Sequence, residues 1–202
     1  MTNTHYFSNK KEASWINQIK QQAESNEIVL IGIDGGGGAG KSTFARKIQE
    51  QINDVTIIHK DDFYLSKGRE MKENPELQPI GADYDWRRLE EQVLKPLSNG
   101  HFARYQRYDW DFDKLAEWYE VKASGVIVVE GVYATRPELH VYYDWTVWID
   151  TPKLTRLNRG IERDGEQARS MWELYWMKQE DRYFEQIRPF EKVDLRISGQ
   201  DD

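Results

Sequence analysis

The 202-residue sequence contains no cysteine, which excludes disulfide bonds and thiolate zinc sites and gives no sign of an oxidising compartment. Its four histidines show no metal-ligand spacing. Long apolar runs are missing too. Continuous apolar runs such as Val126 to Val129 are short, whereas a helix needs about 20 apolar residues to span a bilayer. The amino-terminal residues are polar, unlike a signal peptide. We therefore expect a cytoplasmic protein without a membrane segment.

Basic residues are also scarce, with 28 Lys and Arg against 35 Asp and Glu and a net charge of −7. Nonspecific nucleic-acid binding depends on clustered Lys and Arg, so we expect no nucleic-acid partner. A small anionic ligand remains compatible with this balance, because a few local charges can meet it. The length suits one α/β domain, and we expect residues 1–202 to form a single domain. Homo-oligomer formation stays open.

Strand-like and helix-like segments alternate along the chain. Short β-branched apolar runs predict buried strands at Ile28–Ile33, Val55–His59, Val126–Glu130, Trp145–Ile149 and Val193–Ile197. Apolar residues at helical spacing precede the first run and separate most of the others, for example over Asp85–Leu97. Such alternation favours a parallel sheet covered by helices, the α/β class.

A glycine-rich loop follows the first predicted strand and precedes a predicted helix. It matches the pattern G-x-x-x-x-G-K-[ST] at every fixed position. Its N–H groups and the helix amino terminus favour phosphate, while Lys41 is suited to the β- and γ-phosphates and Ser42 to Mg²⁺. We assign nucleotide binding to Gly35, Gly36, Gly37, Gly38, Ala39, Gly40, Lys41, Ser42 and Thr43.

Carboxylates end two further predicted strands. Asp61 and Asp62 follow the second strand, where open α/β sheets bind ligands, and one of them could serve as a base. We expect an extended segment here, in which alternation points Asp62 away from Asp61. Glu130 ends a buried strand and is a second candidate metal ligand beside Ser42. The alternative for each acid is a capping role in the following turn.

Two other segments are unusual. Residues 156–170 carry Arg156, Arg159, Arg163 and Arg169 among acids, so they are either a lid that closes over the triphosphate or a salt-bridged surface helix. Residues 99–121 are crowded with aromatic side chains, which favours either a hairpin or flap over a pocket or a small aromatic core under a loop. Neither alternative is preferred from the residues alone.

Several of these motifs, in this order, resemble the uridine kinase and phosphoribulokinase family. The resemblance covers about residues 28–197 and is carried by 35–42, Asp61-Asp62-Phe63-Tyr64, Tyr84-Asp85-Trp86, Tyr108-Asp109-Trp110, Val129-Glu130-Gly131 and 159–164. The P-loop is widespread, whereas the aspartate-aromatic block followed by the arginine segment is far more specific.

The resemblance implies a P-loop fold with a five-stranded parallel sheet, ATP with Mg²⁺, and a nucleoside or similar compound as phosphoryl acceptor. By resemblance, Asp61 is the catalytic base and Tyr64 contacts the substrate. The acceptor pocket falls on Tyr108, Asp109 and Trp110 in the aromatic flap. Arg159 and Arg163 become lid residues that bind the nucleotide, and Arg163 also assists catalysis.

This sequence departs from the uridine kinase pattern near residue 83. It has Gly81-Ala82-Asp83-Tyr84-Asp85 without the family's His-Pro pair, so Asp83 or Asp85 is the expected ribose ligand. Gly160 replaces a frequent second arginine, and Arg169 is the candidate substitute. The acceptor stays open among uridine, cytidine, nicotinamide riboside, pantothenate and other alcohols. A nucleotide-dependent switch or scaffold is the rival to a kinase.

Overall fold

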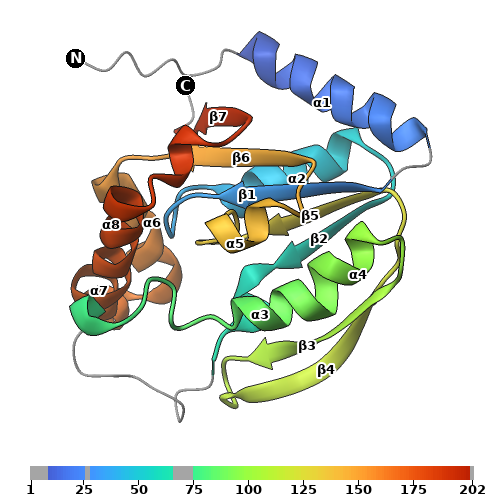
Figure 1. The fold of residues 1–202 in the computed structure, drawn as a ribbon. Coiled ribbons are helices and arrows are strands. Elements are labelled where there is room, and N and C mark those ends of the chain that lie inside the picture. Colours follow the sequence, from blue (N-terminus) through green and yellow to red (C-terminus); the bar gives the residue numbers. More distant parts are fainter. Residues whose placement is uncertain (1–8, 26–27, 66–74, 201–202) are drawn as a thin grey trace.

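A computed structural model of the chain describes residues 9–25, 28–65 and 75–200. Five parallel strands form its main sheet, in the order β2-β5-β1-β6-β7 (Figure 1). Their bounds are β1 Val29–Asp34, β2 Val55–His59, β5 Val126–Glu130, β6 Trp145–Asp150 and β7 Leu195–Ser198. The α/β fold with a five-stranded parallel sheet is thus confirmed.

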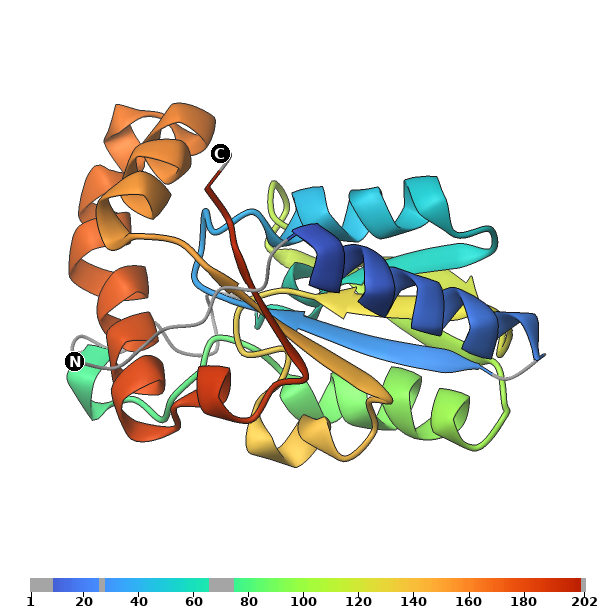
Figure 2. The same cartoon turned by 90° about the horizontal axis from the view of Figure 1, so that it is seen from above.

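Alternate residues of the central strands pack on opposite faces of the sheet. Val29 and Ile31 face α1 (Asn9–Glu24) and α2 (Lys41–Gln51), whose buried side chains include Ile19 and Ile48. Leu30 belongs to the opposite cluster, with Ile127 from β5. Figure 2 shows the two helical layers above and below the sheet. Because both faces of these strands are buried, they read as continuous apolar runs.

The opposite face is covered by α5 (Pro137–His140) and by one helix that runs from Trp86 to Ser98. That helix consists of α3 (Trp86–Leu89), a π turn (Glu90–Leu94) and α4 (Lys95–Ser98). Pro96 has no backbone N–H and would clash with the carbonyl four residues earlier in a regular α-helix. The wide turn before it gives this carbonyl more room.

Residues 103–121 form an antiparallel hairpin of β3 (Ala103–Asp109) and β4 (Lys114–Val121). The predicted hairpin and the predicted aromatic core are both present, whereas a flap over a pocket stays a prediction. Tyr105 is buried in the second core cluster, whereas Phe112 and Trp118 are exposed. The hairpin is therefore anchored along one side and open to solvent along the other.

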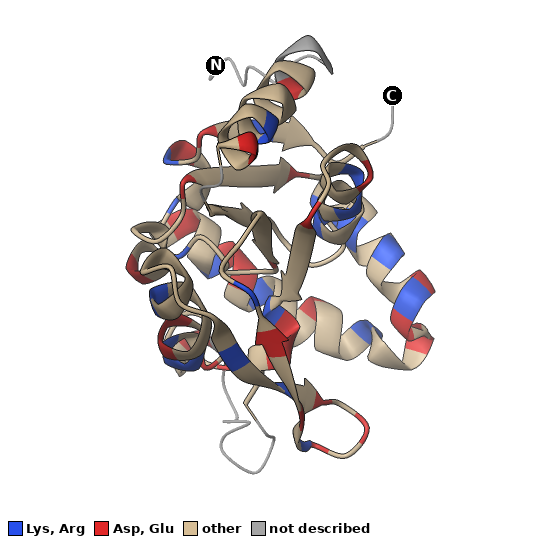
Figure 3. Cartoon of the chain, turned by 90° about the vertical axis from the view of Figure 1, so that its right-hand side faces the viewer, with Lys and Arg blue, Asp and Glu red and all other residues tan. Residues whose placement is uncertain are grey.

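Residues 153–186 form a separate group of helices at the carboxyl ends of the strands (Figures 1 and 2). It comprises α6 (Lys153–Asp164), α7 (Arg169–Met171), a π turn (Trp172–Trp176) and α8 (Met177–Gln186). Figure 3 shows acidic and basic positions interspersed around the outer helices. Within the described ranges, no helix is long and apolar enough to cross a bilayer.

Candidate active site

The loop between β1 and α2 has a backbone that only glycine tolerates at key positions. Gly38 and Gly40 have φ angles of 73° and 102°, in the left-handed region. A Cβ added to Gly38 would also lie 2.4 Å from the carbonyl oxygen of Arg156. The glycines therefore allow the tight turn that presents N–H groups before α2, the geometry suited to phosphate.

Asp34, the last residue of β1, anchors the start of this loop and was missed in the sequence. Its buried carboxylate accepts hydrogen bonds from the N–H of Gly35 at 2.7 Å and of Tyr133 at 3.0 Å, and from the hydroxyl of Tyr183 at 2.8 Å. Burial raises the pKa of Asp34, while hydrogen bonds from Thr135, Gly35 and Tyr183 oppose the rise. The sequence feature that could have identified Asp34 is a charged residue at the end of an apolar strand.

The loop is also held from behind by a second buried acid that the sequence did not reveal. Glu180 on α8 accepts the N–H of Gly37 at 2.8 Å, and its other oxygen lies 2.5 Å from a guanidinium nitrogen of Arg156. Arg156 also donates to the Thr151 carbonyl at 3.2 Å. Arg156 therefore supports the loop from the buried side, rather than facing a ligand as a lid residue would.

Oxygen and nitrogen groups suited to magnesium and phosphate meet at the start of α2. Lys41 Nζ donates to the Gly36 carbonyl at 2.9 Å, and Ser42 Oγ donates to Glu130 Oε1 at 2.9 Å. His59 Nδ1 lies 2.6 Å from the same Glu130 oxygen. Burial opposes ionisation of Glu130, but His59 and the Lys41 charge hold its pKa below the usual value.

These groups fit a magnesium–nucleotide complex. Among the described residues, no group of three or more His, Cys, Asp or Glu side chains forms a cage for a metal. Mg²⁺ bound with phosphates needs only one or two protein oxygens, because phosphate oxygens and waters complete its shell. Ser42 and Glu130 provide such a pair, on adjacent elements at the end of the sheet.

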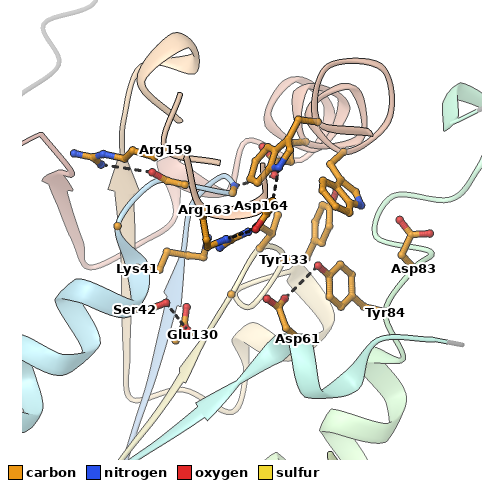
Figure 4. Close-up of a pocket in the computed structure, with 18 of the residues that line it drawn as sticks. Lys41, Ser42, Asp61, Asp83, Tyr84, Glu130, Tyr133, Arg159, Arg163 and Asp164 are labelled. Atoms are coloured by element: carbon orange, nitrogen blue, oxygen red, sulfur yellow. Dashed lines mark hydrogen bonds and ion pairs between the residues drawn. The ribbon is translucent and has the colours of Figure 1, made fainter. Parts of the chain in front are cut away.

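A cavity of about 660 Å³ joins this loop to a second group of side chains. Figure 4 shows Lys41, Ser42, Glu130 and Arg159 at one end and Asp61, Asp83 and Tyr84 at the other, with Arg163 between them. Its lining is Gly37, Gly38, Gly40, Lys41, Ser42, Thr43, Arg46, Asp61, Asp83, Tyr84, Trp110, Glu130, Gly131, Val132, Tyr133, Arg159, Arg163, Asp164, Trp172, Trp176, Gln179 and Glu180. We call the two ends the phosphate end and the acceptor end.

The acceptor end brings together two carboxylates from separate segments. Asp61 Oδ1 accepts the Tyr84 hydroxyl at 3.3 Å, and Asp83 Oδ1 accepts the Tyr175 hydroxyl at 2.9 Å. Burial raises the pKa of Asp83. Trp110 adds an aromatic wall.

Asp62 points elsewhere, although not for the reason expected. Residues 60–63 form a 3₁₀ turn, so the expectation of an extended segment was wrong. Asp62 Oδ2 instead accepts the Tyr105 hydroxyl at 3.2 Å, against the hairpin. It is absent from the described cavity lining, unlike Asp61.

Two predicted substrate residues lie one layer behind the cavity. Tyr64 and Tyr108 are buried, and their ring centroids lie 4.3 Å and 5.1 Å from that of Trp110. The Tyr108 hydroxyl donates to Asp113 at 2.5 Å. These tyrosines therefore support Trp110, which itself faces the cavity.

Two others lie outside the described lining. Asp85 caps α3 by accepting the N–H of Arg88 at 3.0 Å. Arg169 is held by Glu166 at 2.5 Å and Glu173 at 3.0 Å. Asp85 is therefore a helix cap, a role not predicted for it, and the placement of Arg169 corresponds to the surface salt-bridge alternative.

The remaining arginines do reach the cavity. Arg159 donates to the Gly199 carbonyl at 2.8 Å, which ties α6 to the segment after β7. Arg163 is paired with the neighbouring Asp164 at 2.7 Å, and this hydrogen bond raises its pKa. The side chain is 67% exposed, so it can change partners at little cost.

Residues 30–192 match the phosphoribulokinase/uridine kinase family. The chain belongs to this family. Members of this family transfer a phosphoryl group to an alcohol group, so this chain is a phosphotransferase of that kind. The P-loop and the cavity that joins it to the acceptor end agree with this assignment.

Individual relatives agree with this assignment. The uridine kinase of Clostridium novyi (strain NT) is 34% identical over 145 residues, which cover 67% of this chain and 68% of the relative. That of Borrelia duttonii (strain Ly) is 30% identical over 177 residues, 84% and 86% of the two chains. A possible uridine kinase from Bacillus stearothermophilus shares the fold, with a TM-score of 0.69, 22% identity, and 93% and 99% of the chains covered.

Proposed function

We propose that this protein transfers the γ-phosphoryl group of ATP to a hydroxyl group of a nucleoside or a similar small molecule. The observation that carries the proposal is the single cavity that connects the P-loop with the carboxylates Asp61 and Asp83. A switch or a scaffold needs the phosphate end only. The uridine kinase relatives support a nucleoside as acceptor.

In this proposal the phosphate end holds the nucleotide. The loop N–H groups and Lys41 bind phosphate oxygens, and Ser42 with Glu130 would hold Mg²⁺. When bound, magnesium ATP supplies the phosphoryl group and neutralises part of its charge. Arg159 and Arg163 add positive charge at the cavity. Arg163 lies between the two ends, where it would stabilise the negative charge of the phosphoryl group in the transition state.

At the acceptor end, Asp61 is the base. It takes the proton of the acceptor hydroxyl while that oxygen bonds to the γ-phosphorus and the bond to the leaving ADP oxygen breaks. Asp83 accepts a hydrogen bond from a second hydroxyl of the acceptor, the role that the sequence left open between Asp83 and Asp85. Trp110, backed by Tyr64 and Tyr108, provides an aromatic surface for a base or ring.

The test is ADP release by the purified chain with Mg²⁺ and ATP, in the presence of single candidate acceptors. Uridine, cytidine, nicotinamide riboside, pantothenate and simple sugars form the panel. We expect turnover only with an acceptor, and a product heavier by one phosphoryl group in mass spectrometry. Nucleotide binding without any acceptor-dependent turnover would instead favour the switch or scaffold.

A further inference from the structure

Lys60 is a fully buried cation next to the proposed base. It opens the 3₁₀ turn at the end of β2 and is 1% exposed. Its Nζ has no hydrogen-bond partner within the described parts of the chain. The backbone is packed closely here, since a Cβ added to Gly131 would lie 2.4 Å from the Lys60 Cβ. The side chain is therefore confined without the usual satisfaction of its charge.

An ammonium without hydrogen bonds is costly inside a protein, so a compensating interaction is expected. Lys60 Nζ lies 3.4 Å from the ring centroid of Tyr84 and 5.4 Å from that of Tyr133. The first distance is well within the range of a cation–π contact. The face of Tyr84 thus takes the place of hydrogen-bond acceptors.

Tyr84 connects this buried charge to the reaction site. Its hydroxyl donates to Asp61 Oδ1 at 3.3 Å, and the residue lines the cavity, whereas Lys60 does not. Lys60 can therefore influence the acceptor through the Tyr84 ring and through its charge, but not by direct contact.

The charged groups that act on Lys60 come from every element around it. Burial lowers the pKa of Lys60 well below its usual value, and the neighbouring Asp61 charge opposes this most strongly. The charged neighbours are Asp61 on the same turn, Asp34 at the end of β1, Asp83 before α3 and Arg136 before α5. Three of the four are acidic, and their charges oppose the effect of burial on the lysine.

We propose that Lys60 is a positioning residue for phosphoryl transfer: its ammonium fixes the ring of Tyr84, whose hydroxyl holds Asp61 toward the acceptor. This inference rests on the proposed kinase function and on Asp61 as its base.

The experiment is a double-mutant cycle of Lys60→Met, which keeps the aliphatic volume, and Tyr84→Phe, which keeps the ring. With the best acceptor, each single variant is expected to lose about tenfold in kcat, with little change in KM for ATP. The double variant should lose little more than either single one, because both changes interrupt the same link.

The pH profile separates positioning from simple stability. Loss of a nearby positive charge disfavours an ionised carboxylate, so the acidic limb of kcat in Lys60→Met should move to higher pH by up to about one unit. Tyr84→Phe should shift the limb in the same direction, because it removes a hydrogen bond to the ionised form. Lys122→Met, at an exposed lysine after β4, is the control and should match the wild type.

Several results would overturn the inference. A lower melting temperature with unchanged kcat and pH profile would make Lys60 purely structural. If the losses in kcat of the two single variants multiply in the double variant, Lys60 acts independently of Tyr84. If Lys60→Met does not fold, Lys60→Gln is measured in the same way. A wild-type pH profile of kcat in Tyr84→Phe would by itself refute the link from Lys60 through Tyr84 to Asp61. Absence of acceptor-dependent turnover in the wild type would contradict the proposed function instead.

Discussion

The two ends of the cavity are built in different ways. The lining of the phosphate end comes mostly from one continuous stretch, residues 37–43, whose backbone conformation and N–H groups are proposed to do most of the binding. The acceptor end collects side chains from distant segments, including Asp61, Asp83, Trp110 and Trp176. Backbone groups can serve any nucleotide, whereas side chains can be exchanged one at a time. We therefore expect the choice of acceptor to reside in the second group.

The two ends also differ in charge. The phosphate end holds Lys41 and Arg159 together with Glu130, whereas the acceptor end holds the carboxylates of Asp61 and Asp83 beside the Tyr84 ring. Arg163 lies between them (Figure 4). Substitutions at one end should thus affect nucleotide handling, and those at the other end acceptor handling. The following predictions test this division.

The largest effect is expected at the proposed base. Asp61→Asn keeps the side-chain size and the contact with Tyr84 but removes the proton acceptor, and a positioned base contributes about 10²- to 10⁴-fold. Single-turnover transfer with the best acceptor should fall by about this factor. ATP affinity should change little, because the phosphate end is intact.

Asp62→Asn is the matched control for Asp61→Asn. Asp62 faces Tyr105 of the hairpin and not the described cavity lining, so its replacement should cost a few-fold at most in turnover. Equal and mild losses in both variants would remove Asp61 from the mechanism. A larger loss in Asp62→Asn would transfer the role of base to that residue.

At the phosphate end, Lys41→Ala should reduce transfer to every acceptor by about 10²- to 10³-fold, the usual effect of removing one preorganised charge-stabilising donor. Among the described residues its side chain donates one hydrogen bond, to the Gly36 carbonyl, so the fold should persist. Turnover across the acceptor panel and circular dichroism measure the two outcomes. A folded variant with near-normal turnover would contradict the assignment of the phosphate end.

Two arginines of the last third distinguish a cavity residue from a surface ion pair. Arg163→Ala should lower kcat by about 10- to 100-fold, the effect of losing one charge-assisted hydrogen bond, with a smaller effect on ATP binding. Arg169→Ala should change neither, since its partners are exposed glutamates outside the described lining. Steady-state kinetics and nucleotide titration suffice. If Arg163→Ala alters only the melting temperature, Arg163 too belongs to a surface pair.

The contrast between the two ends also explains what could be predicted from the sequence. The P-loop, the five strands and the acids at their ends follow from local patterns, because each depends on neighbouring residues. β7 shows the limit, since it begins at Leu195, two residues after the predicted start. The Asp194 carboxylate binds Thr146 across the strands, a long-range contact that a local pattern does not contain.

The residues that sequence reasoning missed are all held by long-range contacts. Glu180 reaches Gly37 across 143 positions, and the Tyr183 hydroxyl reaches Asp34 across 149. Nothing in the residues near Glu180 distinguishes it from a solvated helix acid. Arg156 was similarly grouped with the other arginines, although only its burial against Glu180 gives its role.

The smallest predicted effect tests the pair that the sequence left unresolved, Asp83 and Asp85. Asp83→Ala should raise the acceptor KM about tenfold without affecting ATP, since the low end of the range for a hydrogen bond to a charged group, about 1.5 kcal/mol, applies to a partly exposed side chain. Asp85→Ala should leave this KM unchanged and lower the free energy of unfolding by about 1 kcal/mol, the usual cost of a lost helix cap.

The two aspartates also differ in their expected pH dependence. Burial raises the pKa of Asp83, and only its ionised form can accept hydrogen bonds with both oxygens. Acceptor KM in the wild type should therefore rise as the pH falls through the raised pKa of Asp83, and Asp83→Ala should lack this rise. Kinetics at several pH values, together with urea unfolding, measure both variants.

If Asp85→Ala raises the acceptor KM and Asp83→Ala does not, the ribose ligand is Asp85 and the acceptor end extends beyond the cavity described above.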